Sequence, residues 1–252
     1  MRDCDRRHKC YPRTTDLLPT RLLDITNSCH GFIRLLDRTR VKSGPYAALS
    51  HRWGPPGEHS NFGTYRSNID EHSSGILVEH LPKTFQDAVC VTHSLGLQLL
   101  WIDSLCIVQD DPDDWETESK LMERVFSSAY CTIAASCAAG NSDGFLKPRP
   151  ERSTVLVNGP ANTGAMYYVC ETIDDFNHDV EQSELNQRGW VLQERALSRR
   201  TIYFTERQSY WECGEGVRCE TMTVMKKFVS RYVQLLLNFI IRIRGSSVRK
   251  TC

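Results

Sequence analysis

Three short apolar segments, separated by two helical patterns, constrain the fold of this chain more than any other feature. The apolar segments cover residues 46–53, 99–108 and 130–136. Between them, residues 82–95 and 115–129 repeat apolar side chains at helical spacing. Alternating strands and helices are typical of a parallel sheet with right-handed crossovers. We therefore predict an α/β fold, with a parallel sheet and flanking helices.

The carboxyl ends of these three strands should meet at one edge of the sheet. In this sequence the ends lie at Trp53, around Cys106 and at Ser136. Ligands of parallel α/β sheets bind at that edge, where the chain leaves the strands. We therefore look for functional side chains near these three positions.

The remaining segments predict additions to this core. Residues 22–25 and 32–36 are strand candidates, and the polar stretch 54–80 is typical of a long loop. After Asn141 the pattern changes, and we predict a C-terminal α+β lobe packed on the sheet. Its expected elements are two strands at 154–157 and 166–170, a helix at 189–198 and two strands within 201–213.

Composition excludes several classes of protein. The 252 residues contain 31 Lys and Arg against 31 Asp and Glu, which argues against binding to nucleic acid or to an anionic membrane through bulk charge. The longest apolar stretch, residues 228–243, contains two arginines, so we predict no transmembrane segment. Eleven cysteines form an odd set and the N-terminus has no apolar signal segment, which indicates a reducing, cytoplasmic location.

Glu118 is the most informative acidic residue. It falls on the apolar stripe of the 115–129 helix, between Trp115 and Met122, so we expect its carboxylate to point inward. Burial raises the proton affinity of a carboxylate, as acid–base chemistry requires. The alternative is a structural acid near a helix start, paired with an arginine.

Two further carboxylates lie among apolar neighbours. Asp103 is predicted within the 99–108 strand, where a charge needs a partner. A buried ion pair with an arginine such as Arg52 or Arg188 is the alternative to catalysis. Glu194 shares a helical face with Trp190, and either an architectural or a functional role fits it.

The segment 50–54 places four polar or aromatic side chains at a strand end. Ser50, His51, Arg52 and Trp53 precede Gly54. Arginine binds phosphate with two hydrogen bonds and tryptophan stacks on rings, so this segment could hold an anion and a ring. Packing at a strand end is the alternative.

The cysteines give little support for a metal site or a nucleophile. The sequence contains Cys4-x3-His8-x-Cys10 and Cys213-x5-Cys219, but neither half contains a CxxC pair, so we predict no metal. Cys106 has no histidine nearby in the sequence, which favours a packing role. The common glycine-rich dinucleotide motif, the P-loop and the HExxH motif are absent, and we predict no cofactor.

A set of segments, in order, resembles the fungal heterokaryon incompatibility (HET) domain. The set covers about residues 19–220, and it is specific as a whole although each segment alone is short. The segments are PTRLLD (19–24), YAALSHRWG (46–54), LPKTFQDAV (81–89), LGLQLLWIDSLCIVQDDPDDWETE (95–118), MERVFSSAYCTIAAS (122–136), DGF (143–145), RGWVLQERALSRRTIYF (188–204) and WEC (211–213).

The resemblance implies a signalling domain of fungal non-self recognition whose activation leads to growth arrest and programmed cell death. The HET domain is remotely similar to Toll/interleukin-1 receptor domains, some of which cleave NAD with a glutamate near the sheet edge. This implies a Toll/interleukin-1 receptor-like core, with NAD as a substrate. We expect catalytic roles for Glu118 and Asp103. The expected ligand-binding residues are Ser50, His51, Arg52, Trp53, Gly54, Cys106, Gln109, Arg188, Trp190, Gln193 and Glu194.

Two functions stay open from the sequence. The domain is either an enzyme that consumes a nucleotide such as NAD, or a non-catalytic module that binds another copy or a trigger protein. We expect an irregular tail at 1–18, the HET domain at 19–221 with its core at 46–136 and its lobe at 141–221, and a tail at 222–252. That tail departs from the family, which suggests a truncated or mis-spliced gene model or a basic amphipathic helix that docks on a partner or membrane.

Overall fold

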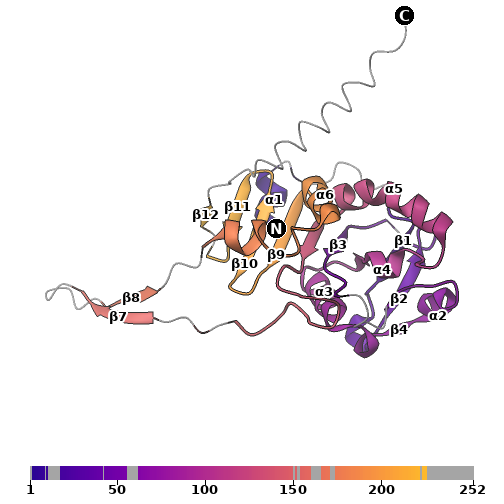
Figure 1. Cartoon of the computed structure of the whole chain (residues 1–252), viewed down its shortest axis with the longest axis horizontal. Coiled ribbons are helices and arrows are strands. Elements are labelled where there is room, and N and C mark those ends of the chain that lie inside the picture. Colours follow the sequence, from indigo (N-terminus) through magenta and orange to yellow (C-terminus); the bar gives the residue numbers. More distant parts are fainter. Residues whose placement is uncertain are drawn as a thin grey trace, which may run out of the picture.

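A central sheet with four parallel strands organises the computed structural model (Figure 1). The structure describes residues 2–8, 10, 18–41, 43–55, 62–149, 151, 154–159, 166–170, 174–221 and 223–225. Within these residues the strands are ordered β12-β11-β10-β9-β6-β3-β5-β1-β2-β4. A separate hairpin, β7 with β8, lies apart from the sheet (Figure 1). The fold is therefore a mixed α/β arrangement.

The strand boundaries agree with most of the predicted segments. The strands are β1 (Arg21–Asp24), β2 (Phe32–Asp37), β3 (Tyr46–Ser50), β4 (Ile76–Leu77), β5 (Leu99–Trp101), β6 (Cys131–Ala134), β7 (Thr154–Asn158), β8 (Met166–Cys170), β9 (Arg200–Phe204), β10 (Ser209–Cys213), β11 (Gly216–Cys219) and β12 (Val224–Met225).

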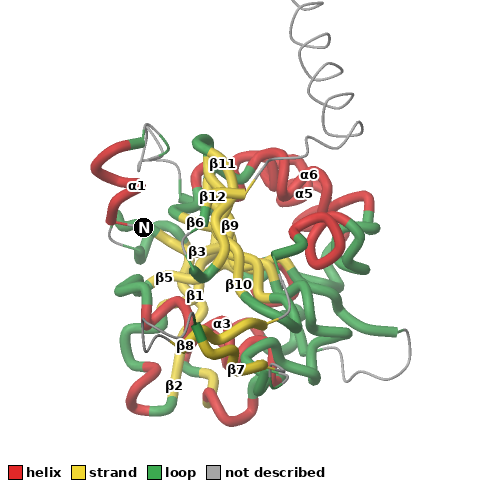
Figure 2. Tube along the Cα trace, turned by 90° about the vertical axis from the view of Figure 1, so that its left-hand side faces the viewer, coloured by secondary structure: helices red, strands yellow, loops and turns green. Residues whose placement is uncertain are grey.

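The helices connect and flank these strands (Figure 2). They are α1 (Arg2–Arg7), α2 (Ile69–Ser74), α3 (Lys83–Ser94), α4 (Asp103–Cys106), α5 (Pro112–Ser128) and α6 (Gly189–Leu197), with short turns of helix at Ser28–His30, Val78–His80 and Asn177–Glu181. The predicted helices at 82–95, 115–129 and 189–198 correspond to α3, α5 and α6 and are confirmed. No helix within the described part of the chain is both long and apolar enough to cross a membrane.

β3 is the middle strand of the parallel group. It pairs in parallel with β5 on one side and with β6 on the other. The sequence predicts the parallel direction of these strands but not their order. All five of its residues are buried. β9 then pairs in parallel with β6, and β10 to β12 follow in antiparallel order. The strands after residue 199 thus extend the same sheet, whereas we had expected a lobe packed on it.

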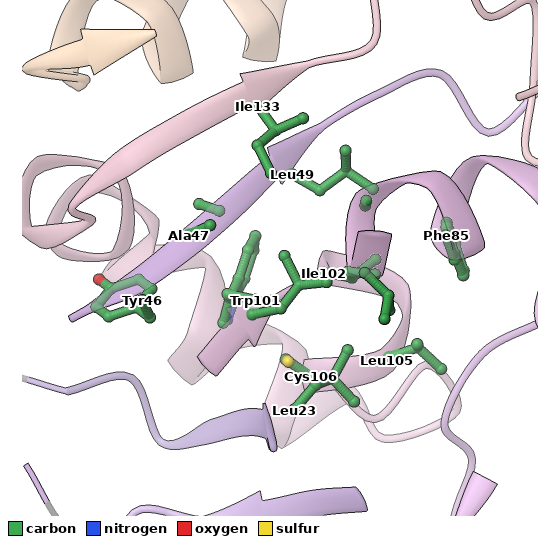
Figure 3. Close-up of a cluster of buried hydrophobic side chains, with 14 of the residues drawn as sticks. Leu23, Tyr46, Ala47, Leu49, Phe85, Trp101, Ile102, Leu105, Cys106 and Ile133 are labelled. Carbon is green, nitrogen blue, oxygen red and sulfur yellow. The ribbon is translucent and has the colours of Figure 1, made fainter. Parts of the chain in front are cut away.

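The core is formed where α3, α4 and α5 meet the sheet. Figure 3 shows side chains of β1, β3, β5 and β6 converging with those of α3 and α4. Trp101 of β5 meets Phe126 of α5 edge to face at 5.7 Å between ring centroids. The buried Tyr46 hydroxyl donates to the Val125 carbonyl at 2.6 Å, which ties β3 to the end of α5. Apolar burial and one internal hydrogen bond therefore fix α5 against the sheet.

The predicted strand at 99–108 is wrong beyond its first residues. β5 ends at Trp101, and α4 begins at Asp103. The Asp103 carboxylate accepts a hydrogen bond from the Ser104 backbone N–H at 2.7 Å. Short acidic side chains favour such local bonds over a strand ladder. The apolar residues after Ile102 are buried, but as a helical turn.

The predicted loop at 54–80 is wrong in its second half. Thr64 forms a parallel bridge with Val108, and α2 and β4 follow. The buried Thr64 hydroxyl bonds both the Leu105 carbonyl, at 2.7 Å, and His72 Nδ1, at 2.9 Å. The polar side chains of this segment form hydrogen bonds with one another inside the fold. A loop prediction from polar composition assumes that such side chains face solvent, and it is therefore wrong here.

The prediction of an irregular N-terminal tail at 1–18 is also wrong in part, because α1 occupies Arg2–Arg7. Residues 1, 9, 11–17, 56–61 and 226–252 lie outside the described residues. The predictions for most of the 222–252 tail fall there.

Asp87 of α3 anchors the DGF segment. Its buried carboxylate accepts hydrogen bonds from the backbone N–H groups of Phe145, at 2.8 Å, and Leu146, at 3.0 Å. Gly144, directly before Phe145, has a positive φ of 73°, and a Cβ there would lie 2.7 Å from Lys83 Cγ. The segment therefore needs both the carboxylate and the glycine.

Replacing Asp87 by Ala should destabilise the fold by about 2–4 kcal/mol, because the buried Phe145 N–H and the partly buried Leu146 N–H lose a charged acceptor. Urea unfolding of the variant measures this loss. Asp70→Ala, at an exposed aspartate of α2, is the matched control and should change the free energy of unfolding by under about 0.5 kcal/mol. Equal effects from the two variants would contradict the anchoring role.

Candidate functional site

A cavity of about 230 Å³ lies where β3, α4, α5 and α6 meet, beyond the carboxyl ends of the parallel strands. This is the edge at which ligands of such sheets bind. Its lining combines acidic, basic and aromatic side chains with an apolar base. The lining residues are Leu49, His51, Trp53, Asp103, Ile107, Gln109, Trp115, Ser119, Met122, Arg188, Val191 and Glu194.

Asp103 joins the residues that leave β3. The Trp53 indole Nε1–H donates to Asp103 Oδ2 at 2.9 Å, and His51 Nδ1 lies 4.0 Å from Asp103 Oδ1. We had expected an arginine partner such as Arg52 or Arg188, and that expectation is wrong. An indole and an imidazole accompany this carboxylate instead, so two aromatic rings are held in place at the cavity.

His51 is buried and uncharged at neutral pH. Burial lowers its pKa more strongly than the nearby Asp103 charge raises it, and Arg188 lowers it further. The ring contacts Phe85 edge to face at 5.2 Å between centroids. A neutral imidazole can donate from one nitrogen and accept at the other. His51 therefore supplies a polar but uncharged surface.

Arg188 brings a positive charge to the cavity. It lies directly before α6, and its Nη1–H donates to the His51 carbonyl at 3.0 Å. The residue itself is exposed, so the guanidinium keeps donors available to a ligand at the cavity mouth. An anionic group, such as phosphate, suits this position.

Glu194 of α6 has the most perturbed carboxylate in this cavity. Burial raises its pKa to about 7, and the negative charge of Asp103 raises it as well, whereas Ser50 and Arg188 lower it. Its Oε2 atom is buried without a hydrogen-bond partner among the described residues. Burial of an unpaired carboxylate oxygen is costly, and such groups concentrate at functional sites.

α5 contributes the rim of the cavity. Trp115, Ser119 and Met122 lie on one helical face, at the spacing that brings side chains together. We had placed Trp115 in the buried stripe of this helix, but 52% of its surface is exposed. The prediction was wrong because this face of α5 borders a cavity and does not pack into the core. The spacing of residues 115, 119 and 122 is the signal that could have identified this cavity-lining face.

Glu118 is buried but does not line the cavity. Only 2% of its surface is exposed, as the helical pattern predicts, and it lies 3.9 Å from the Arg21 guanidinium. Burial raises its pKa, while Thr20 and Arg21 lower it. Arg21 also binds Asp114 at 2.5 Å. The arginine-paired arrangement that we weighed as the alternative is thus the one observed.

The other predicted residues divide between the cavity and its surroundings. Gln109 lines the cavity and donates from Nε2 to the Ile107 carbonyl at 2.9 Å. Cys106 is buried in α4 outside the cavity, and burial raises the pKa of its thiol to about 12, which suits packing and not nucleophilic attack.

Arg52 turns away from this cavity. It forms an ion pair with Glu184 and lines a separate cavity together with Ser136. Ser50 is buried beneath the site, and Gly54 adopts a positive φ of 99° where the chain turns. Gln193 is exposed on α6, and the Trp190 side chain lies outside the described residues.

The parallel strands and the cavity at their carboxyl edge define a mixed α/β domain with a cavity between strand ends and helices. A family model described as heterokaryon incompatibility protein (HET) matches residues 46–194. The chain belongs to this family, and the match ends at Glu194 of the cavity. Neither the curated proteins nor the solved structures include a match to the chain.

Glu194 should make the stability of the protein depend on pH. Its folded-state pKa of about 7 lies above the ordinary value of 4.5, so the protonated carboxyl stabilises the fold below about pH 4.5 and this contribution is lost as pH rises through 7. Glu194→Gln has no carboxyl group to ionise, so its stability should not fall in this way. Between pH 4.5 and pH 8, its free energy of unfolding should rise by on the order of 3 kcal/mol relative to that of the wild type.

Urea unfolding at a series of pH values tests this expectation. Glu116→Gln, at an exposed glutamate of α5, is the matched control and should follow the wild type throughout. A constant difference between Glu194→Gln and the wild type at all pH values would show that Glu194 titrates normally.

Proposed function

We propose that this chain acts in fungal non-self recognition as an effector whose activation leads to growth arrest and programmed cell death, and that it acts by cleaving NAD in the cavity at the sheet edge. Membership of the HET family supports the first part. The second part rests mainly on Glu194, a carboxylate with a pKa of about 7 in a cavity that also contains Arg188 and indole rings.

The chemistry requires a carboxylate near a developing positive charge. Cleavage breaks the bond between the ribose C1′ and the nicotinamide nitrogen, and the electron pair leaves with nicotinamide. The remaining sugar carries positive charge in an oxocarbenium-like transition state. Water then adds to C1′ and releases one proton, giving ADP-ribose. Ionised Glu194 would stabilise the sugar cation, and a buried carboxylate does so more strongly than one in water.

The size of the cavity restricts how a dinucleotide would bind. At about 230 Å³ it is smaller than the roughly 300–1,000 Å³ of most ligand pockets. One ring and its ribose fit such a volume, while the rest of the molecule would extend outward. In this arrangement Trp115 at the rim stacks on a ring, and Arg188 at the mouth binds phosphate.

The proposal assigns the role of the charge-stabilising carboxylate to Glu194 and not to Glu118. NAD was suggested by the remote similarity of HET domains to Toll/interleukin-1 receptor domains, which implied a helical glutamate. Both candidates are helical glutamates with raised pKa values. Only Glu194 lines the cavity, since Glu118 is buried against Arg21. Asp103 would act as a positioning residue through Trp53 and His51.

The β7–β8 hairpin favours a second function, that of a self-associating module. Among the described strands, β7 and β8 pair only with each other. Their apolar side chains are exposed; those residues are Val155, Leu156, Val157, Met166, Tyr167 and Val169. Isolated hairpins are marginally stable, and exposed apolar patches mark interfaces. A second copy of the same hairpin, packed face to face, would cover them.

Incubation of the purified full chain with NAD tests the enzymatic proposal. The wild type should release nicotinamide, measured by liquid chromatography, at a rate that rises with pH through about 7 as Glu194 ionises. Glu194→Gln should lower the rate on the order of 100-fold, because the carboxylate charge is lost. Glu116→Gln should keep the wild-type rate.

Glu118→Gln decides between the two glutamates. Loss of activity in Glu118→Gln alone, with the variant folded, would assign the reaction to Glu118. Absence of nicotinamide release from folded wild type at high protein concentration would overturn the enzymatic proposal.

Charge placed on the hairpin should weaken self-association. Val155→Lys with Val169→Lys puts two like charges on one cross-strand pair. Analytical ultracentrifugation should show a concentration-dependent dimer for the wild type and a monomer for the double variant. Leu77→Lys, at an exposed position of β4, is the control. A monomeric wild type would contradict this second function.

A further inference from the structure

Four potential metal ligands from distant parts of the chain meet beside the sheet. Cys4, His8 and Cys10 come from the N-terminal segment, and Cys213 ends β10. Their ligand atoms all lie within 4.8 Å of one another. Cys219, which the sequence analysis considered as a ligand together with Cys213, is not part of this group and lies near Thr221 instead.

Local structure explains how the first two ligands come together. Cys4 lies in α1, and the His8 backbone N–H donates to the Cys4 carbonyl at 2.9 Å. A spacing of four residues on a helix places two side chains on the same face. The sequence lacks a CxxC pair, but one helical turn brings Cys4 and His8 together just as closely.

The distances suit tetrahedral coordination. With a zinc–sulfur bond of about 2.3 Å, two thiolates of a tetrahedral site lie about 3.8 Å apart. Cys213 Sγ and His8 Nδ1 are already 3.5 Å apart. The other ligand atoms lie within 4.8 Å of one another, so small rotations of these side chains would bring all four to tetrahedral positions around one ion.

The surroundings support a buried, closed site. Cys4, Cys10 and Cys213 are buried together, and Trp211 packs on them. Gly214 allows a close approach, because a Cβ at this position would lie 3.3 Å from Cys10 Sγ. The Arg200 guanidinium, opposite Cys213 on β9, binds Asp5 of α1 at 2.6 Å.

We propose that Cys4, His8, Cys10 and Cys213 bind one Zn²⁺ ion in a structural site that joins the N-terminal segment to β10. Three thiolates and an imidazole are a ligand set that zinc prefers. All four tetrahedral positions are filled by protein groups, so no position is left for substrate. The site is separate from the cavity that contains Glu194.

Metal analysis of the full chain, purified with reductant after expression in zinc-supplemented medium, tests the proposal. We expect one zinc per chain after extensive dialysis. X-ray absorption should show three sulfur ligands at about 2.3 Å and one nitrogen at about 2.0 Å. Removal of the metal by a chelator should lower the melting temperature, because zinc binds the folded chain.

Two variants and a control assign the ligands. Cys213→Ser and His8→Ala should each lose zinc, and the partly exposed His8 leaves no buried void when it is truncated. Cys90→Ser, at an exposed thiol of α3, should retain zinc fully. Circular dichroism checks that each variant is folded.

Two outcomes would overturn the proposal. One is zinc retained in full by both ligand variants, or absent from the folded wild type. The other is a disulfide between Cys4 and either Cys10 or Cys213, found by non-reducing mass spectrometry of the protein as isolated, before any chelator is added.

Discussion

The parallel pairing of β3 with both β5 and β6 is the constraint on which the rest of the structure depends. Every residue of β3 is buried, and Leu49 is its contribution to the cavity lining, so the polar side chains of this segment reach the cavity only after Ser50, where the strand ends. β5 ends beside it and leads directly into α4. Asp103 at that junction accepts the Trp53 indole hydrogen bond, and so links the two strand ends. The cavity forms around this link.

The same geometry determines the electrostatics of the cavity. Two carboxylates, Asp103 and Glu194, line a small and partly apolar space, so their mutual repulsion adds to the cost of burial. Arg188 offsets part of that cost, and the neutral His51 adds no charge. The cost of burial and repulsion that Arg188 does not offset raises the pKa of Glu194. A structural acid of this kind would normally have a closer partner, as Glu118 has in Arg21.

The parallel core and half of the cavity residues could be predicted from the sequence, through strand ends and helical faces that follow from apolar spacing and through the family resemblance. His51, Trp53, Asp103 and Glu194 were identified in this way and do meet. Long-range pairing could not be predicted. That β9 joins β6, that Asp103 bonds an indole, and that Cys213 reaches Cys4 all depend on contacts between distant segments. Trp115 was misassigned because a buried face and a cavity-lining face have the same spacing.

The titration of the Glu194 carboxyl group, followed by carbon-13 NMR with and without NAD, tests the central claim most directly. The account predicts a carboxyl resonance that titrates near pH 7 in the free protein and shifts when NAD is added, assigned by its disappearance in Glu194→Gln. A Glu194 resonance that titrates near its ordinary pKa of 4.5 and does not respond to NAD would contradict both the unusual proton affinity and the place of the ligand.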